Sequence, residues 1–120
     1  MTYGFKIGSR SENGRKDWKK YYDNSMLADG EEMKKIAERA IKHKVYISIG
    51  YSERDAMNAT LYNSNMFISP DGKTVNHRKL KPTGSERFVW GDADKDFFPV
   101  METPWGAMGS MICWESYMPL

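Results

Sequence analysis

Residues 31–51, EEMKKIAERAIKHKVYISIGY, place a helical pattern directly before a strand pattern. The apolar residues of 31–43 recur at the spacing of a single helical face: Met33, Ile36, Ala37, Ala40 and Ile41. Residues 45–51, VYISIGY, are β-branched and aromatic, which predicts a strand. A helix that leads at once into a strand indicates α/β layering.

A hairpin is expected next along the chain. Residues 61–68, LYNSNMFI, predict a second strand, and residues 74–80 predict a third. Between them stands Ser69-Pro70-Asp71-Gly72, where proline presets one dihedral angle and glycine accepts a positive φ. The second and third predicted strands therefore form a hairpin that follows the first predicted strand.

The flanking regions are less regular. Residues 1–25 are expected to form a loop that leads into a short helix with Trp18, Tyr21 and Tyr22. Residues 82–98 are rich in Gly, Pro, Asp and aromatics, which predicts a long ordered loop. Residues 107–113, AMGSMIC, predict a buried strand that ends at Cys113.

Composition restricts the class of protein. The chain has 120 residues, enough for one domain at most, with 40% hydrophobic and 28% charged residues. A net charge of +2 argues against a dedicated nucleic-acid binder. No apolar run reaches the roughly 18 residues of a membrane span, and the N-terminus has no apolar signal region. We therefore expect a cytoplasmic protein without membrane contact.

The single cysteine, Cys113, excludes an internal disulfide and leaves two interpretations. It is either a small buried hydrophobic residue or a nucleophile. A nucleophilic thiol needs a group that takes its proton, yet His43 stands at a predicted helix end and His77 beside Arg78, so both are poor bases. Carboxylates and lysines remain as the partners.

The basic stretch His77-Arg78-Lys79-Leu80-Lys81 fits a solvated strand edge or a phosphate contact. The glycine-rich loop of a P-loop is absent. Residues 92–96, DADKD, hint at a calcium loop, but glycine and glutamate are missing at the positions that such a loop requires. No His/Cys cluster has metal-ligand spacing, so we expect no metal.

The stretches that carry a family resemblance occur in this order: residues 77–83 (HRKLKPT), Glu86-Arg87, Trp90-Gly91, Glu102-Thr103-Pro104, Gly106, Gly109, Cys113-Trp114-Glu115 and residues 117–120 (YMPL). Together they resemble the nitrilase branch of the carbon–nitrogen hydrolase superfamily. Residues 4–24 and the helix and hairpin of residues 31–76 fit the same family. The resemblance implies a partial carbon–nitrogen hydrolase domain over 1–120.

The resemblance also implies roles for particular residues. The family uses Glu, Lys and Cys, often with a second Glu. Its nucleophile carries over to Cys113 and its lysine to Lys79, which follows an arginine as in the family, whereas Lys81 is the weaker candidate. The second glutamate carries over to Glu86. Trp114 is expected to form a wall of the substrate pocket. Glu115 is expected to support that wall without contacting the substrate directly.

The first glutamate of the family, its general base, lies upstream of residue 1 and has no counterpart here. The resemblance therefore implies an incomplete piece of an α-β-β-α four-layer sandwich, and we expect the 120-residue chain alone to be inactive. The expected parent hydrolyses a small-molecule nitrile to a carboxylic acid and ammonia through a thioimidate. It needs no cofactor and forms a homo-oligomer.

Other hypotheses stay open. The Cys-Trp-Glu run favours nitrilases and cyanide-degrading relatives over aliphatic amidases, but a hydratase or amidase outcome is an alternative. The missing base motivates a second reading, a non-catalytic interaction module or degenerate relative. A third reading is a nucleic-acid-binding module built on residues 77–81 and the aromatics, which the small net charge disfavours.

Overall fold

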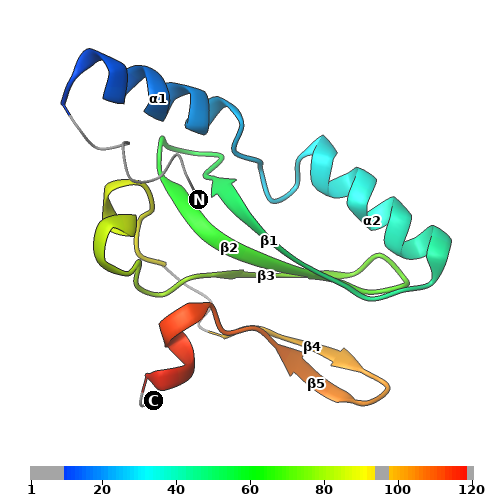
Figure 1. Ribbon diagram of the computed structural model, residues 1–120. Helices are drawn as coiled ribbons and strands as arrows, with labels where there is room; N and C mark the ends of the chain where they lie inside the picture. Colours follow the sequence, from blue (N-terminus) through cyan, green and yellow to red (C-terminus); the bar gives the residue numbers. More distant parts are fainter. Residues whose placement is uncertain (1–9, 94–97, 119–120) are drawn as a thin grey trace.

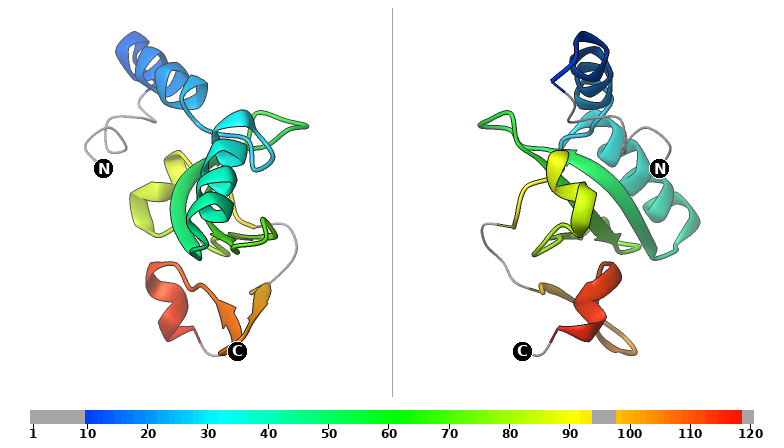
Figure 2. Two further views of the ribbon diagram at one scale, coloured as in Figure 1. Left: turned by 90° about the vertical axis from the view of Figure 1, so that its right-hand side faces the viewer. Right: turned by 60° about the vertical axis from the view of Figure 1, so that its left-hand side comes forward.

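The computed structural model describes residues 10–93 and 98–118. The elements are α1 (Glu12–Asp23), α2 (Glu31–His43), β1 (Ile47–Arg54), β2 (Leu61–Ile68), β3 (Thr74–Arg78), the 3-10 turn η1 (Gly84–Phe88), β4 (Val100–Thr103), β5 (Gly106–Gly109) and the 3-10 turn η2 (Cys113–Tyr117). Strands β1, β2 and β3 form an antiparallel sheet in that order, and β4 and β5 form a separate hairpin. Helices α1 and α2 lie on one side of the sheet, and the hairpin and η2 on the other (Figures 1 and 2).

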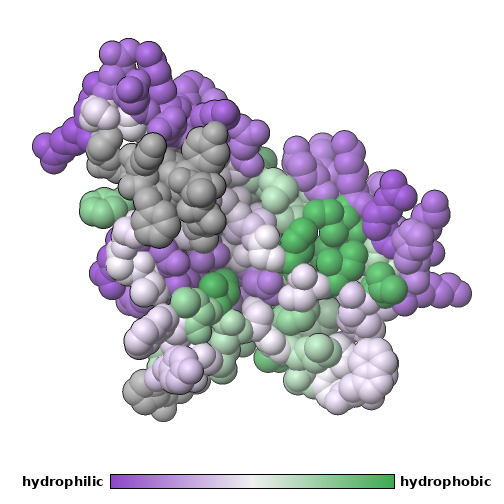
Figure 3. Space-filling model, in the orientation of Figure 1, coloured by the Kyte–Doolittle hydropathy of each residue, from purple (hydrophilic) through white to green (hydrophobic). Residues whose placement is uncertain are grey.

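The hydrophobic core lies between α2 and the sheet. Its buried members come from the helix and from two strands: Met33, Ala40, Tyr51, Met66 and Ile68. Burying one methionine or isoleucine side chain stabilises a fold by about 1.5–3 kcal/mol. The outer sides of both helices are hydrophilic, and hydrophobic residues gather below α2 (Figure 3). The apolar stripe of residues 31–43 is therefore the surface that holds the helix on the sheet.

Two predicted elements are confirmed at both ends. The helix spans Glu31–His43 and the second strand Leu61–Ile68. The helix expected within residues 1–25 is α1, which has 12 residues and begins after an N-cap at Ser11, whose side chain accepts a hydrogen bond from the Gly14 amide. Residues 1–9 and residues 94–97 of the expected loops, and residues 119–120, lie outside the described residues.

The first strand begins later than predicted, at Ile47 instead of residue 45. Lys44 adopts a left-handed conformation with φ 55°, and the Val45 amide donates to the carbonyl of Ala40. This pattern ends a helix by satisfying its last carbonyls. Because Val45 completes the helix end, the strand starts only beyond it, at Ile47, and continues to Arg54.

The third strand ends at Arg78 instead of residue 80. The Lys79 amide still donates to the Asn63 carbonyl, at 2.8 Å. The Leu80 amide instead donates to Oε1 of Glu115, at 2.6 Å. A side chain from η2 thus replaces the sheet as the partner of this amide.

The prediction of a buried strand over residues 107–113 is wrong. Strand β5 spans Gly106–Gly109, and its residues are exposed. Residues 110–112 belong to no strand, and Cys113, also exposed, begins η2. Within the described ranges β5 pairs with β4 alone, so no further layer covers its apolar side chains.

Within the described residues, no helix is long and apolar enough to cross a membrane.

Candidate functional site

Strand alternation separates two neighbouring basic residues. Side chains of successive strand residues point to opposite faces of a sheet. Arg78 pairs in register with Ser64 and shares the helix-covered face with Tyr51. His77 and Lys79 therefore lie on the opposite face, the side on which η2 packs (Figure 1). The sheet directs the candidate catalytic lysine away from the core and toward the segment that carries Cys113.

The Lys79 side chain is almost fully buried, with 1% of its surface exposed. Its Nζ donates to Oε2 of Glu86 at 2.6 Å and to Oγ1 of Thr83 at 3.0 Å. A buried ammonium is unfavourable without a charged or hydrogen-bonding partner, and Glu86 supplies both. Lys79 and Glu86, two of the residues that the resemblance singled out, are thus in direct contact in the structure.

Glu86 is held by the turn that carries it. Its Oε2 also accepts the backbone N–H of Thr83, at 2.9 Å, at the start of η1. Thr83-Gly84-Ser85-Glu86 follows the spacing of a capping box, in which the glutamate reaches back to the first residue of the turn. Thr83 was not among the predicted site residues, and this spacing is the signal that could have identified it.

Cys113 occupies the first position of η2 with an exposed side chain. Its φ is 59°, in the left-handed region that residues with a Cβ rarely adopt. Such a conformation costs of order 1–3 kcal/mol and often marks a functional site. The interpretation of Cys113 as a small buried hydrophobic residue is wrong, because its thiol lies open to small molecules from solvent.

Glu115 lies two residues beyond Cys113, and its side chain has no exposed surface. Its Oε2 lies 2.8 Å from Nε2 of His77 and accepts the Ile112 amide at 2.6 Å. Its Oε1 accepts the Leu80 amide at 2.6 Å. Both carboxylate oxygens therefore face protein donors, so Glu115 lies in the interior and not on the open surface.

Trp114 and Lys81 lie nearer to solvent. The Trp114 side chain is 64% exposed, and its ring lies 6.0 Å from that of Tyr117, centroid to centroid. Lys81 forms an exposed ion pair with Asp92. Lys81 therefore lacks the burial and the Glu86 contact of Lys79, which favours Lys79 as the site lysine.

The two histidines have different surroundings. His43 is exposed in the last turn of α2, where a cationic side chain suits the helix dipole. His77 is buried between Glu115 and the ring of Phe98, whose centroid lies 5.3 Å away. His77 thus contacts the segment of the candidate nucleophile through Glu115.

A second polar cluster lies on the helix-covered face behind Lys79. Arg78 donates through Nε to Oε1 of Glu53, at 2.9 Å, and its guanidinium lies 3.9 Å from the ring centroid of Tyr62. Ser64 and Asn76 donate to the other oxygen of Glu53, at 2.6 and 2.7 Å. The cluster fixes the residue that precedes Lys79.

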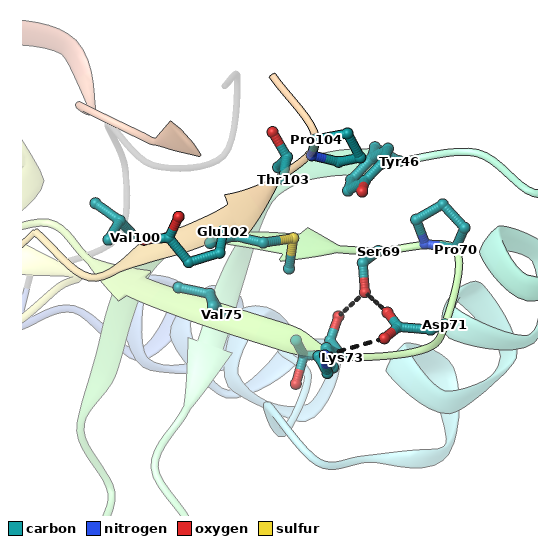
Figure 4. Close-up of a pocket in the computed structure, with 12 residues that line it drawn as sticks. Tyr46, Ser69, Pro70, Asp71, Lys73, Val75, Val100, Glu102, Thr103 and Pro104 are labelled. Atoms are coloured by element: carbon teal, nitrogen blue, oxygen red, sulfur yellow. Dashed lines mark hydrogen bonds and ion pairs between the residues drawn. The ribbon is translucent and has the colours of Figure 1, made fainter. Parts of the chain in front are cut away.

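A groove of about 780 Å³ lies elsewhere, between the β2–β3 turn and β4 (Figure 4). Its wall includes Ser69, Asp71, Lys73, Val75 and Glu102. Ser69 and Lys73 both contact the Asp71 carboxylate, and the Lys73–Asp71 pair is exposed. The groove includes neither Cys113 nor Lys79, so it is not the candidate site.

Comparisons with known proteins relate the whole chain to one family. The model of the carbon–nitrogen hydrolase family matches residues 1–120. An aliphatic nitrilase from Sinorhizobium fredii is 41% identical over 99% of this chain and 38% of its own length. Nitrilase 2 from Arabidopsis thaliana is 42% identical over 100% of this chain and 35% of its own. A bifunctional nitrilase/nitrile hydratase from Lupinus angustifolius is also 42% identical, over 99% of this chain and 34% of its own length.

The chain thus spans about a third of the length of these curated relatives. Among solved structures, an N-terminal amidase matches with a TM-score of 0.52 and 25% identity, over 72% of this chain and 20% of the amidase. The same kind of enzyme with an Asn-Glu-Ala peptide matches with a TM-score of 0.53, over 78% of this chain and 22% of the amidase. The α/β arrangement of helices and sheet is therefore shared with a carbon–nitrogen hydrolase fold.

Proposed function

Because the chain belongs to the carbon–nitrogen hydrolase family, we propose that it supplies the nucleophile, the lysine and the second glutamate of a nitrilase. The observation that carries the proposal is the arrangement of the exposed Cys113 in η2 and the buried Lys79 ammonium, paired with Glu86, on the side of the sheet on which η2 packs. Identity of about 40% to named nitrilases over the whole chain supports the nitrile as substrate.

The reaction begins with attack of the Cys113 sulfur on the electrophilic nitrile carbon. A C–S bond forms, one C–N π bond breaks, and the nitrogen takes a proton to give a thioimidate. Lys79 stabilises the negative charge that develops on nitrogen, and Glu86 keeps its ammonium in place. A first water displaces ammonia and leaves a thioester, and a second water releases the carboxylic acid and restores the thiol.

Proton transfer to and from sulfur and water needs a general base, which typically contributes about 10²–10⁴-fold in rate. The resemblance assigns this role to a glutamate that residues 1–120 do not contain. The proposal therefore assigns the base to a residue other than residues 1–120. It also takes the complete enzyme to be an α-β-β-α sandwich that forms a homo-oligomer. We expect the 120-residue chain assayed alone to release no ammonia.

The chemistry described needs neither a metal nor an organic cofactor. Trp114 forms a wall of the nitrile pocket in this proposal, and Glu115 supports that wall from behind. The Trp114 ring, on the residue that follows Cys113, is exposed and offers an apolar surface.

The test is ammonia release from a panel of aliphatic and aromatic nitriles by the protein as it occurs in its source. Cys113→Ala should abolish release, whereas Met57→Ala, at a 92% exposed position, should leave it unchanged. Ammonia release that survives Cys113→Ala would refute the mechanism. A well-folded protein that turns over no nitrile would favour a non-catalytic relative.

A hydratase outcome is the second candidate, because one relative is named a bifunctional nitrilase/nitrile hydratase. In that outcome the intermediate collapses to an amide before ammonia leaves. Quantifying amide and acid from the same nitrile separates the two: acid with equimolar ammonia supports the nitrilase, and amide without ammonia supports the hydratase.

A further inference from the structure

We propose that His77 and Glu115 form a positioning pair that holds the Cys113 turn against the strand of Lys79. This inference deepens the proposed function and rests on the roles given there to Cys113 and Lys79. Neither residue of the pair reaches the substrate in this account. The pair instead sets where the thiol lies relative to the ammonium.

The pair joins the strand that leads to Lys79 with the turn that begins at Cys113. His77 precedes Lys79 by two residues, and Glu115 follows Cys113 by two residues. Two residues along a strand return to the same face, so His77 and Lys79 share the face on which η2 packs. The contact of 2.8 Å between Nε2 of His77 and Oε2 of Glu115 therefore joins residues that are close in sequence to both candidate catalytic groups.

Glu115 binds both segments at once through backbone amides. Its Oε1 accepts the amide of Leu80, the residue after Lys79, at 2.6 Å. Its Oε2 accepts the amide of Ile112, the residue before Cys113, at 2.6 Å. One carboxylate thus connects the residue after the lysine with the residue before the nucleophile, and three donors fix its orientation.

Both side chains of the His77–Glu115 pair are buried. The side-chain exposures are 2% for His77 and 0% for Glu115, so water does not compete for their hydrogen bonds. Within the described residues Nδ1 of His77 has no hydrogen-bond partner. The imidazole is therefore anchored through Nε2 alone, with its face against Phe98. Loss of Glu115 would leave the buried imidazole without a partner, and loss of His77 would leave the buried carboxylate with two backbone donors instead of three. Either loss favours displacement of the turn, because a buried polar group that is not fully satisfied is costly.

A positioning role has a clear consequence for catalysis. Attack on a nitrile needs the thiol and the charge-stabilising ammonium in a fixed relation to one carbon–nitrogen bond. A misplacement of about 1 Å by a residue outside the chemistry can cost on the order of 10²-fold in rate. A change in the pair should therefore lower kcat and leave KM nearly unaltered.

The experiment compares two replacements of one histidine in the whole protein. His77→Phe keeps the ring and its stacking on Phe98 but removes the donor to Glu115. His77→Gln removes the ring but keeps a side-chain N–H donor. We expect His77→Phe to lower kcat by about 10–100-fold with KM changed less than threefold, and His77→Gln to recover most of the loss. His43→Phe, at the exposed end of α2, is the matched control and should match the native protein.

A second readout does not depend on nitrile turnover. Amide hydrogen exchange of Leu80 and Ile112 should accelerate at least tenfold in His77→Phe and return toward the native rate in His77→Gln. Amides of the β1–β2 ladder should keep their native rates in both variants. All assays are run below the thermal transition of each variant, so that global unfolding does not contribute.

Native exchange at Leu80 and Ile112 in His77→Phe would overturn the inference. Faster exchange with native kcat would also overturn it, because the pair would then be structural only. If the native protein turns over no nitrile, the proposed function fails, and the exchange comparison alone decides whether the pair holds the Cys113 turn.

Discussion

The ammonium of Lys79 lies 2.6 Å from the Glu86 carboxylate, with the lysine side chain 1% and the glutamate side chain 25% exposed. The two residues are seven apart in sequence and are brought together because β3 ends and η1 turns back. The pair therefore combines a buried cation with a carboxylate that solvent can still reach.

Glu86→Leu should destabilise the fold more than Glu86→Gln. Leucine leaves the buried Lys79 ammonium with only Thr83, whereas glutamine keeps an oxygen that can accept a hydrogen bond. We expect a loss of about 1–3 kcal/mol for glutamine and of about 3–5 kcal/mol for leucine. Urea unfolding measures both, with Glu38→Gln on the exposed side of α2 as the control. Equal stability of the native and leucine forms would contradict the assigned role of the pair.

Arg78→Lys should not behave as a conservative change. The guanidinium donates to Glu53 through two nitrogens and lies over the Tyr62 ring, and a lysine ammonium cannot reproduce this planar arrangement. The free energy of unfolding should fall by about 1–3 kcal/mol. Thermal unfolding checks this against Arg39→Lys on the exposed side of α2. If the midpoint of thermal unfolding shifts no more in Arg78→Lys than in that control, the contacts of the Arg78 guanidinium have no structural role.

Gly91 should not tolerate a methyl group. A Cβ at Gly91 would lie 2.8 Å from Cγ2 of Thr60, whereas a Cβ at Gly50 would meet nothing closer than the Ser64 carbonyl oxygen at 4.0 Å. We expect Gly91→Ala to cost about 1–3 kcal/mol and Gly50→Ala to be neutral or mildly stabilising. Chemical denaturation of the two variants side by side decides this, and the reverse order would be inconsistent with the packing of residue 91 on β2.

Alkaline stability should depend on Tyr51. Burial, and then the negative charge of Glu53, raise the pKa of the Tyr51 phenol well above its usual range, and the hydroxyl donates to Asn76 at 2.9 Å. The unfolded phenol ionises near pH ~10 and the folded one does not. The stability from this difference is therefore fully present below that pH and is lost above it, by about 1.4 kcal/mol per pH unit.

Unfolding free energies between pH 8 and 11 test this. The native protein should lose more stability over that window than Tyr51→Phe, which has no phenol to titrate. Tyr117→Phe is the control, because Tyr117 is exposed and should follow the native curve. If the unfolding free energies of the native and Tyr51→Phe proteins fall in parallel between pH 8 and 11, Tyr51 does not contribute to the alkaline loss of stability.

Local patterns predicted the helix over residues 31–43 and the strand over residues 61–68, because periodicity reports the face that each element buries. The family resemblance, rather than any local pattern, marked Lys79 and Glu86 as site residues, and the two are in contact in the structure. The prediction failed for residues 107–113, whose apolar composition suggested burial. Burial depends on a covering layer, and β5 is covered by none within the described residues.

The contact between His77 and Glu115 could not be predicted from local pattern, because 38 residues separate the two. The sequence suggested a poor base at His77 and a pocket residue at Glu115. Each residue alone gives no signal of the other, and only the packing of η2 on the sheet brings them together.

The most direct test of the central claim is to find the atom that the nitrile carbon joins. The protein from its source is mixed with an excess of a turned-over nitrile, quenched in acid within one turnover and digested for mass spectrometry. For the thioimidate, the account predicts an added mass equal to that of the nitrile on the peptide that contains Cys113. For the thioester, it predicts an added mass equal to that of the acyl group less one hydrogen. Ammonia release with an unmodified Cys113 peptide, or with the adduct on another residue, would contradict it.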